Sequence, residues 1–67
     1  MENKDLICKA LVQALKLTRN QEDLAALDYN PYDETVIATY DNGATRRINV
    51  AMDSGTAMIR DIMYVLD

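Results

Sequence analysis

The chain of 67 residues has no histidine, no tryptophan and no phenylalanine, and its only cysteine is Cys8. One cysteine excludes an intramolecular disulfide framework, and without histidine a zinc site would depend on carboxylates, which zinc rarely uses alone. A nucleophilic Cys8 would need a histidine partner, so we expect this thiol to be buried and inert. The sequence predicts no enzyme, no catalytic residue, no metal and no cofactor.

Long hydrophobic runs are also missing. Residues 1–5 are polar, and the apolar stretch that follows is interrupted by Lys9, Gln13 and Lys16, which fits neither a signal peptide nor a membrane span. We therefore expect a cytoplasmic protein with no membrane contact. The net charge of −4 favours solubility and opposes non-specific binding to DNA or anionic lipid.

The length predicts a single domain that covers residues 1–67. A chain of this size buries only about 60% of the surface that its unfolded form exposes, and small domains often need a further source of stability. Because disulfides and metals are excluded, self-association is the remaining source of stability for this chain. A hydrophobic content of 49% with four methionines is compatible with a homodimer.

Two segments have the periodicity of amphipathic helices. In residues 4–18 the apolar residues recur at three- and four-residue steps: Ile7, Leu11, Ala14 and Leu15, with Cys8, Val12 and Leu17 widening the stripe. From residue 53 to the C-terminus the apolar stripe comprises Met58, Ile59, Ile62, Val65 and Leu66, widened by Met63. Arg60, Asp61 and Tyr64 are expected to face outward. Either Asp53 or Ser54 can cap the second helix.

The sequence between the helices predicts strands. Residues 35–40 and 45–50 contain β-branched residues and flank Asn42-Gly43, the strongest short hairpin signal. Two registers are open. A two-residue loop pairs Ile37 with Ile48, whereas a three-residue loop with Gly43 in a bulge pairs Val36 with Ile48 and Tyr40 with Ala44.

Residues 22–29 fit either a short helical turn or an opening strand. Pro31 makes Asn30 extended and predicts a turn after it. We favour the strand, because a lone two-stranded hairpin is marginal in water. The predicted fold class is α+β: a small antiparallel β-meander of two or three strands with an N-terminal and a C-terminal helix packed on one face, in the order α-β-β-β-α.

The segment Asp53-Ser54-Gly55-Thr56 matches the active-site signature of aspartic proteases, in which two carboxylates share a proton. Those loops lie in an all-β barrel, and this chain has too few strands to build one. Here the motif leads directly into a helix, and helix capping explains its residue types. We interpret it as a cap.

The remaining features favour a non-enzymatic protein-interaction domain that regulates or inhibits a larger partner. Tyrosines and acids in and beside the predicted turns suit a contact with another protein. The candidate partner-binding residues are Tyr29, Tyr32, Asp33, Glu34, Tyr40, Asp41, Arg46 and Arg47. Small acidic domains of this kind are common among phage and mobile-element products, which is an association at the level of size and fold alone.

The alternative hypothesis is a nucleic-acid-binding accessory protein. Its basic patch would combine Arg46 and Arg47 of the hairpin with Lys9, Lys16 and Arg19 of the first helix. The sequence pI of about 4.5 opposes this hypothesis, since nucleic-acid-binding domains usually exceed a pI of about 9.

Overall fold

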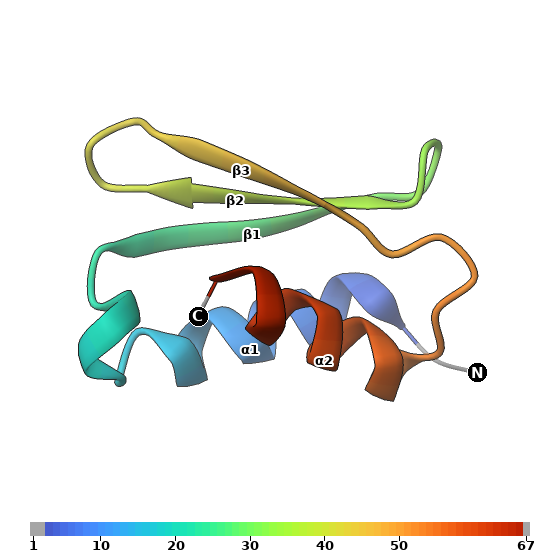
Figure 1. Cartoon of the computed structure of the whole chain (residues 1–67), viewed down its shortest axis with the longest axis horizontal. Coiled ribbons are helices and arrows are strands. Elements are labelled where there is room, and N and C mark those ends of the chain that lie inside the picture. Colours follow the sequence, from blue (N-terminus) through green and yellow to red (C-terminus); the bar gives the residue numbers. More distant parts are fainter. Residues whose placement is uncertain (1–2, 67) are drawn as a thin grey trace.

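The computed structural model describes residues 3–66 and has the predicted element order α-β-β-β-α. The elements are helix α1 (Lys4–Leu15), a 3-10 turn η1 (Arg19–Gln21), strands β1 (Leu24–Asn30), β2 (Thr35–Tyr40) and β3 (Thr45–Asn49), and helix α2 (Gly55–Leu66). The strands form one antiparallel sheet in the order β1-β2-β3. Both helices cover the same face of the sheet (Figure 1).

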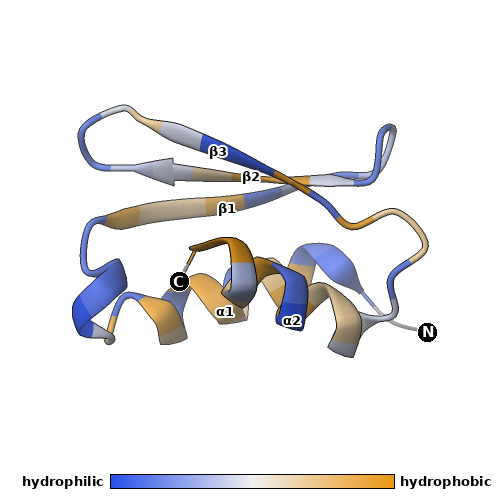
Figure 2. Ribbon diagram, viewed as in Figure 1, coloured by the Kyte–Doolittle hydropathy of each residue, from blue (hydrophilic) through white to orange (hydrophobic). Residues whose placement is uncertain are grey.

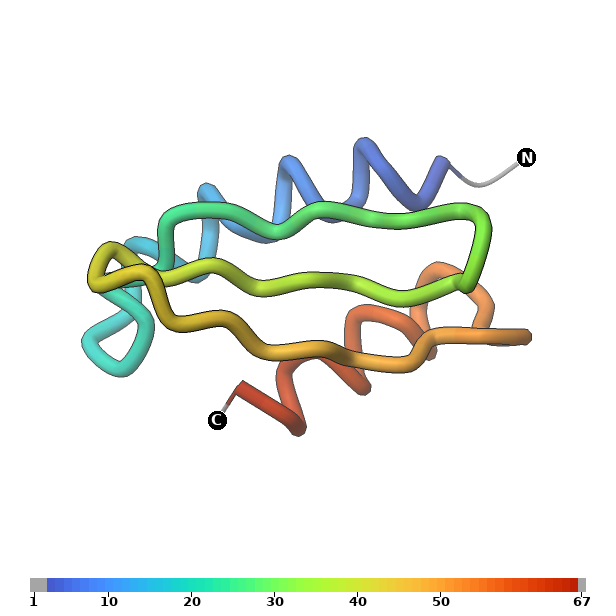
Figure 3. The backbone as a smooth tube through the Cα atoms, turned by 90° about the horizontal axis from the view of Figure 1, so that it is seen from above, coloured from blue at the N-terminus to red at the C-terminus, as the bar shows by residue number. Residues whose placement is uncertain are grey.

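The two helices run in the same direction beneath the sheet. Seen from above, α1 follows the β1 side and α2 follows the β3 side (Figure 3). Apolar residues gather on the helices and on the strands that face them, whereas η1 and the turn between β1 and β2 are polar (Figure 2). No helix within residues 3–66 is both long enough and apolar enough to cross a membrane.

Side-chain caps define where the helices begin. The side chain of Asn3 accepts a hydrogen bond of 3.0 Å from the Leu6 amide at the start of α1. At the start of α2, Ser54 Oγ accepts one of 3.2 Å from the Ala57 amide, so Ser54 rather than Asp53 is the capping residue. Both residue types are preferred at this position because their oxygens satisfy amides that the helix leaves unpaired.

The first helix is shorter than predicted and is rotated relative to its expected apolar stripe. It ends at Leu15 instead of residue 18, because Thr18 is extended and its hydroxyl donates to the Leu15 carbonyl over 2.7 Å. The buried residues are Cys8, Val12 and Leu15, with Ile7 and Leu11 partly buried beside them. Ala14 and Leu17 were expected in the stripe and are exposed.

Residues 24–30 form a strand, as favoured, and the hairpin adopts the register with the three-residue loop. Gly43 has φ +87°, its amide donates to the Tyr40 carbonyl over 2.9 Å, and the Tyr40 amide donates to the Ala44 carbonyl over 2.9 Å. Val36 is therefore opposite Ile48, and β3 ends at Asn49, one residue before the predicted end. This register turns Val36 and Ala38 toward the helices.

One hydrophobic core fills the space between the sheet and the helices. Its buried members are Cys8, Val12, Leu15, Leu24, Leu27, Val36, Ala38, Ile48, Val50, Met58, Ile62 and Leu66. The other sheet face is uncovered, and Asp28, Ile37 and Arg47 lie side by side across its three strands. The two faces alternate along the strands as the pleat requires, except where the register of β1 shifts between Leu24 and Ala26, so that Leu24 and Leu27 are both buried.

Candidate functional site

A hollow of about 420 Å³ opens on the helical side of the molecule, where the chain after α1 meets the second half of α2. Its lining residues are Leu15, Thr18, Asn20, Gln21, Arg60, Met63, Tyr64 and Leu66. The surface that these residues present is mainly apolar. We call this feature the helix-end hollow.

Buried and bridging side chains fix the geometry of the helix-end hollow. Gln21 is buried, its Nε2 donates to the Leu66 carbonyl, and its Oε1 accepts a hydrogen bond of 3.3 Å from the Tyr40 hydroxyl. Arg46 Nη1 donates to the Val65 carbonyl over 2.7 Å. The last carbonyls of a helix have no partner within the helix, so side chains from η1 and β3 here hold the end of α2 in place.

Apolar side chains on the rim of the hollow are exposed. Met63 is 50% exposed and Tyr64 is 85% exposed, and Leu17, next to the lining residue Thr18, is 88% exposed. The sequence predicted Met63 as part of the apolar stripe of α2, but among this helix's large residues only Met58, Ile62 and Leu66 are buried. Single exposed apolar residues need no explanation, whereas a group of them around a hollow is typical of a contact surface.

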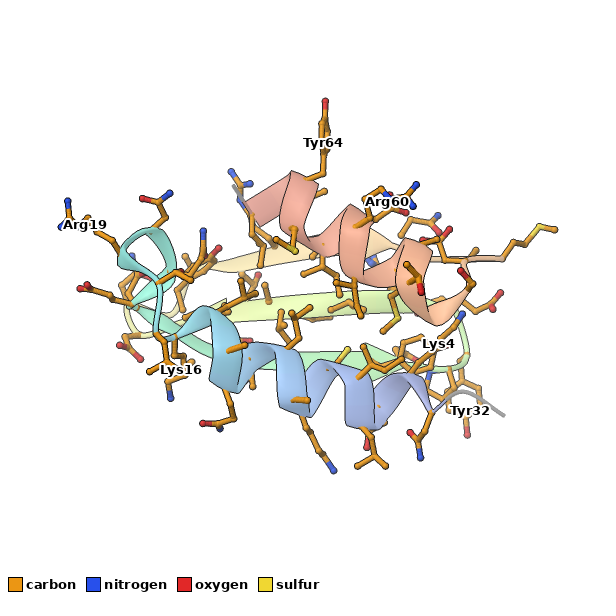
Figure 4. The ribbon with its side chains drawn as sticks, turned by 90° about the horizontal axis from the view of Figure 1, so that it is seen from below. Lys4, Lys16, Arg19, Tyr32, Arg60 and Tyr64 are labelled. Atoms are coloured by element: carbon orange, nitrogen blue, oxygen red, sulfur yellow. The ribbon has the colours of Figure 1, made fainter. Side chains whose placement is uncertain are left out.

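Arg60 is the charged residue among those that line the hollow, and the acids Glu22 and Asp61 directly follow the lining residues Gln21 and Arg60 in the chain. Within residues 3–66, Lys16, Arg19 and Arg60 take part in no ion pair, whereas Lys9 pairs with Asp5 at 3.1 Å and Arg47 with Asp33 at 2.7 Å. Arg60 lines the hollow, and none of the lining residues is acidic. Figure 4 shows Arg19 and Lys16 extending at the end of α1, and Arg60 and Tyr64 extending from α2.

The structure separates the residues that the sequence grouped as a partner-binding site. Tyr32, Asp33 and Glu34 lie in the turn between β1 and β2, whereas Asp41 lies in the turn between β2 and β3, at the opposite end of the sheet (Figure 1). Tyr32 is 96% exposed. The predicted acidic surface is therefore divided between two ends of the molecule.

Two of the predicted tyrosines belong to the edge of the core. Tyr29 and Tyr40 are half-buried and pack against the buried cluster. The Lys4 ammonium lies 5.7 Å from the centre of the Tyr29 ring, within the range of a cation–π contact. Tyr40 donates to Gln21, as described above. Both rings have structural contacts on the helix side of the sheet.

Arg46 and Arg47 project to opposite faces of the sheet, as alternation along β3 requires. Arg46 reaches the end of α2, and Arg47 pairs with Asp33 on the uncovered face. The hydroxyl of Thr35, which donates to Asp33 over 2.6 Å, and the Arg47 guanidinium together lower the pKa of the Asp33 carboxyl. The two arginines do not form one basic patch.

Asp53 is not a hydrogen-bonded cap but one member of a carboxyl pair. Hydrogen bonding with the Asp61 carboxyl, burial and the negative charge of Asp61 raise its pKa, and Lys4 opposes this shift. Its Oδ2 atom is buried and has no hydrogen-bond partner among the described residues. The protease signature requires a second carboxylate, and the carboxylate beside Asp53 in this structure is that of Asp61 in α2.

The described residues offer little for metal or thiol chemistry. No three His, Cys, Asp or Glu side chains within residues 3–66 are grouped to hold a metal ion. Cys8 is fully buried as predicted, and burial, with the nearby charges of Asp5 and Asp28, raises the pKa of its thiol to about 11. A thiol with this pKa is almost entirely protonated at neutral pH, so it is a poor nucleophile.

The helix-end hollow was not predicted from the sequence. The sequence did not identify Gln21 as a functional residue, because a single glutamine between two secondary-structure elements belongs to no characteristic motif. Comparison of the chain with protein-family models, curated proteins and solved structures found no match.

Proposed function

We propose that this chain is a small protein-binding module that regulates or inhibits a larger partner protein, without chemistry of its own. The observation that supports the proposal is the helix-end hollow, whose apolar floor is bordered by the exposed side chains of Met63 and Tyr64. Tyrosine, methionine and arginine are enriched in protein interfaces, and all three occur here within one turn of α2 or beside it.

The proposed contact surface differs from the one expected from the turns. Tyr32 stays a candidate because it is exposed, but its neighbours Asp33 and Arg47 are paired with each other. The hollow combines concavity, apolar surface and unpaired charge, which anchor residues of a partner can fill. We also propose a cytoplasmic location and a phage or mobile-element origin, on composition and size alone.

Affinity capture with the whole chain tests the proposal. The bait is compared with a double variant, Met63→Ser with Tyr64→Ser, and with the control Tyr32→Ser, which removes an equally exposed tyrosine at the far end of the molecule (Figure 4). We expect a captured protein that is lost with the double variant and kept with the control. Equal capture by all three baits would contradict a role for the hollow.

The homodimer expected from composition is a separate proposal. We propose that it uses the uncovered sheet face, where Asp28, Ile37 and Arg47 lie side by side. Light scattering across a range of concentrations tests this, and a monomer at every concentration would overturn the dimer.

Nucleic-acid binding is the competing function, and the unpaired cations are the observation that favours it. Lys16, Arg19 and Arg60, three cations with no ion-pair partner within residues 3–66, are few compared with the roughly 6–10 phosphate contacts of a typical DNA-binding protein, and the net charge of the chain is −4. A mobility shift with duplex and single-stranded oligonucleotides at low salt decides the matter. We expect no shift, and a shift that weakens with salt would favour nucleic acid over protein.

A further inference from the structure

We infer that the second copy in the proposed homodimer packs face to face on the uncovered sheet face, with its strands aligned with those of the first copy. In this arrangement Asp28 of each copy meets Arg47 of the other, and the two Ile37 side chains meet between these ion pairs. The inference rests on the proposed homodimer and adds the geometry of its contact. It is carried by the order of the side chains across the three strands.

Three rows of side chains cross the uncovered face, which Figure 3 shows from above. In the middle row Asp28 of β1 and Arg47 of β3 lie on either side of Ile37 of β2, so an acid and a base flank an apolar residue. The two flanking rows are uncharged: Asn30, Thr35 and Asn49 form one, and Ala26, Thr39 and Thr45 form the other. The charge of the face is therefore confined to one acid at one edge and one base at the other.

Both charged side chains of the middle row are accessible to a second copy. Asp28 is exposed and takes part in no ion pair within residues 3–66. The Arg47 side chain is 67% exposed, and its Nη2 donates to Asp33 over 2.7 Å. A guanidinium has five N–H donors in a planar fork, so the contact with Asp33 leaves donors for another carboxylate.

Symmetry selects one of the ways in which two such faces can meet. Packed sheets have their strands either aligned to within about 30° or crossed at about 90°. A two-fold axis along β2 aligns the strands and places β1 of each copy over β3 of the other, so that each Asp28 meets an Arg47. An axis across the strands would place Asp28 over Asp28 and Arg47 over Arg47, which like charges oppose. In a crossed packing the charged residues would lie over β2 of the other copy, without an opposite charge.

The spacing of packed sheets suits the aligned arrangement. Stacked sheets lie about 10 Å apart, a gap that an arginine and an aspartate reaching from opposite sides can span. Strands lie about 4.8 Å apart, so the two ion pairs stand about 5 Å to either side of the Ile37 contact. A face of three strands is only about 14 Å wide, which is small for a permanent dimer. We expect a reversible dimer with a dissociation constant on the order of 100 µM.

Other occupants suit the uncovered face less well. The three rows contain no aromatic ring on which a base could stack, since Tyr29 and Tyr40 lie on the helix side of the sheet. One acid and one base give neither a polyanion nor a basic segment a continuous row of contacts. The order acid, apolar residue, base is complementary to itself, and a second copy presents that order in reverse.

Reversal of the two charges tests the arrangement. Asp28→Arg and Arg47→Glu each place like charges at both symmetry-related contacts, so we expect each variant alone to associate about tenfold more weakly or less. An equimolar mixture of the two variants restores opposite charges at both contacts, and it should form a heterodimer within about fivefold of the original affinity. Analytical ultracentrifugation at low ionic strength, from about 1 µM to about 1 mM chain, measures these affinities.

Matched variants control for net charge. Asp41→Arg and Arg60→Glu make the same changes in net charge at exposed residues outside the face, in the β2–β3 turn and on α2, and should leave self-association unchanged. Ile37→Lys brings two ammonium groups together at the two-fold axis and should abolish self-association. Circular dichroism shows whether each variant keeps its fold.

The outcomes separate the geometry from the dimer on which it rests. A monomer up to about 1 mM would overturn both and leave the helix-end hollow unaffected. A dimer that persists in Ile37→Lys, or that Asp28→Arg and Arg47→Glu do not weaken, would overturn the geometry alone. Folded single variants that stay monomeric when mixed would also overturn the contact between Asp28 and Arg47.

Discussion

Gln21 connects three parts of the molecule through one buried amide. Its Nε2 donates to the Leu66 carbonyl at the end of α2, and its Oε1 accepts from the Tyr40 hydroxyl of β2. A buried polar group that loses its partner is destabilising by about 1–3 kcal/mol, because it gives up hydration without a replacement bond. The position of α2, and so the shape of the hollow, depends on this residue.

We expect Gln21→Met, which keeps a similar size, to lower the free energy of unfolding by about 1–3 kcal/mol. The matched control Gln13→Met changes an exposed glutamine of α1 and should have little effect. Urea unfolding followed by circular dichroism measures both. Equal stability of the two variants would contradict the bridging role of Gln21.

Asp53 makes the stability of the chain depend on pH. Because Asp61 and burial raise its pKa above the ordinary 3.8, the native state holds its proton to higher pH than the unfolded state. Its contribution to stability is therefore greatest below pH of about 4 and declines as pH rises through the elevated pKa. Asp33, whose pKa is lowered, contributes in the opposite sense: its stabilisation is present above the ordinary pKa and is lost as pH falls.

We expect Asp53→Asn to raise stability relative to the original chain at neutral pH, where it removes the repulsion from Asp61, and to lose this advantage in acid. Asp61→Asn should behave in the same way, because it removes the other member of the pair. Thermal unfolding at a series of pH values measures the difference between each variant and the original chain. A difference that does not change with pH would contradict the raised pKa of Asp53.

At the scale of elements, the strands and helices were predictable because periodicity and turn residues are local signals. The register of the β2–β3 hairpin was not predictable from the sequence. Asn42-Gly43 fits either turn, since both residues tolerate positive φ, and one residue of slip exchanges the two faces of β2. In the observed register Val36 and Ala38 pack against the helices. The helices are distant in sequence from the hairpin, so the hairpin sequence alone does not determine the register.

Gly43 tests the hairpin. Its φ of +87° is disfavoured for residues with a side chain, although a Cβ at this position would meet no atom within 4 Å. We expect Gly43→Ala to destabilise the chain by about 1–2 kcal/mol through backbone strain alone, and Gly43→Asn to cost less. Chemical denaturation compares the two. Unchanged stability of Gly43→Ala would contradict the bulged three-residue turn.

Met52 shows the same strain at a residue that does not suit it. It has φ +65° in the connection between β3 and α2, and its side chain is 97% exposed, so packing does not compensate for the strain. We expect Met52→Asn to stabilise the chain by up to about 1 kcal/mol, because asparagine adopts this conformation more readily. The control Ala51→Asn should bring no gain. A loss of stability in Met52→Asn would indicate that the Met52 side chain has a structural contact.

At the scale of the whole molecule, charge is divided unevenly. The total of −4 is evident from the sequence and predicts that the molecule has no broad cationic surface. It could not show that Arg46 and Arg47 are engaged in bonds while Lys16, Arg19 and Arg60 have no ion-pair partner within residues 3–66. Pairing depends on which side chains the fold brings within a few ångströms of one another.

The hollow also arises only at this scale. It forms because α1 ends at Leu15, η1 turns the chain back, and α2 continues alongside, so that its Met63 and Tyr64 extend past the core. Each helix end was predictable only to within a few residues, and the size of the space between two helix ends depends on both positions. Sequence periodicity placed Met63 at the edge of the buried stripe of α2, whereas the structure places it on the rim of the hollow.

Amide chemical shifts of the isotope-labelled chain, recorded while the captured partner is added, test most directly whether the helix-end hollow is the contact surface. We expect the largest changes at the helix-end hollow, at Thr18, Gln21, Arg60 and Tyr64, and little change at Tyr32 and Asp41 in the two turns. Changes centred on those turns or on the uncovered sheet face around Ile37 would contradict it.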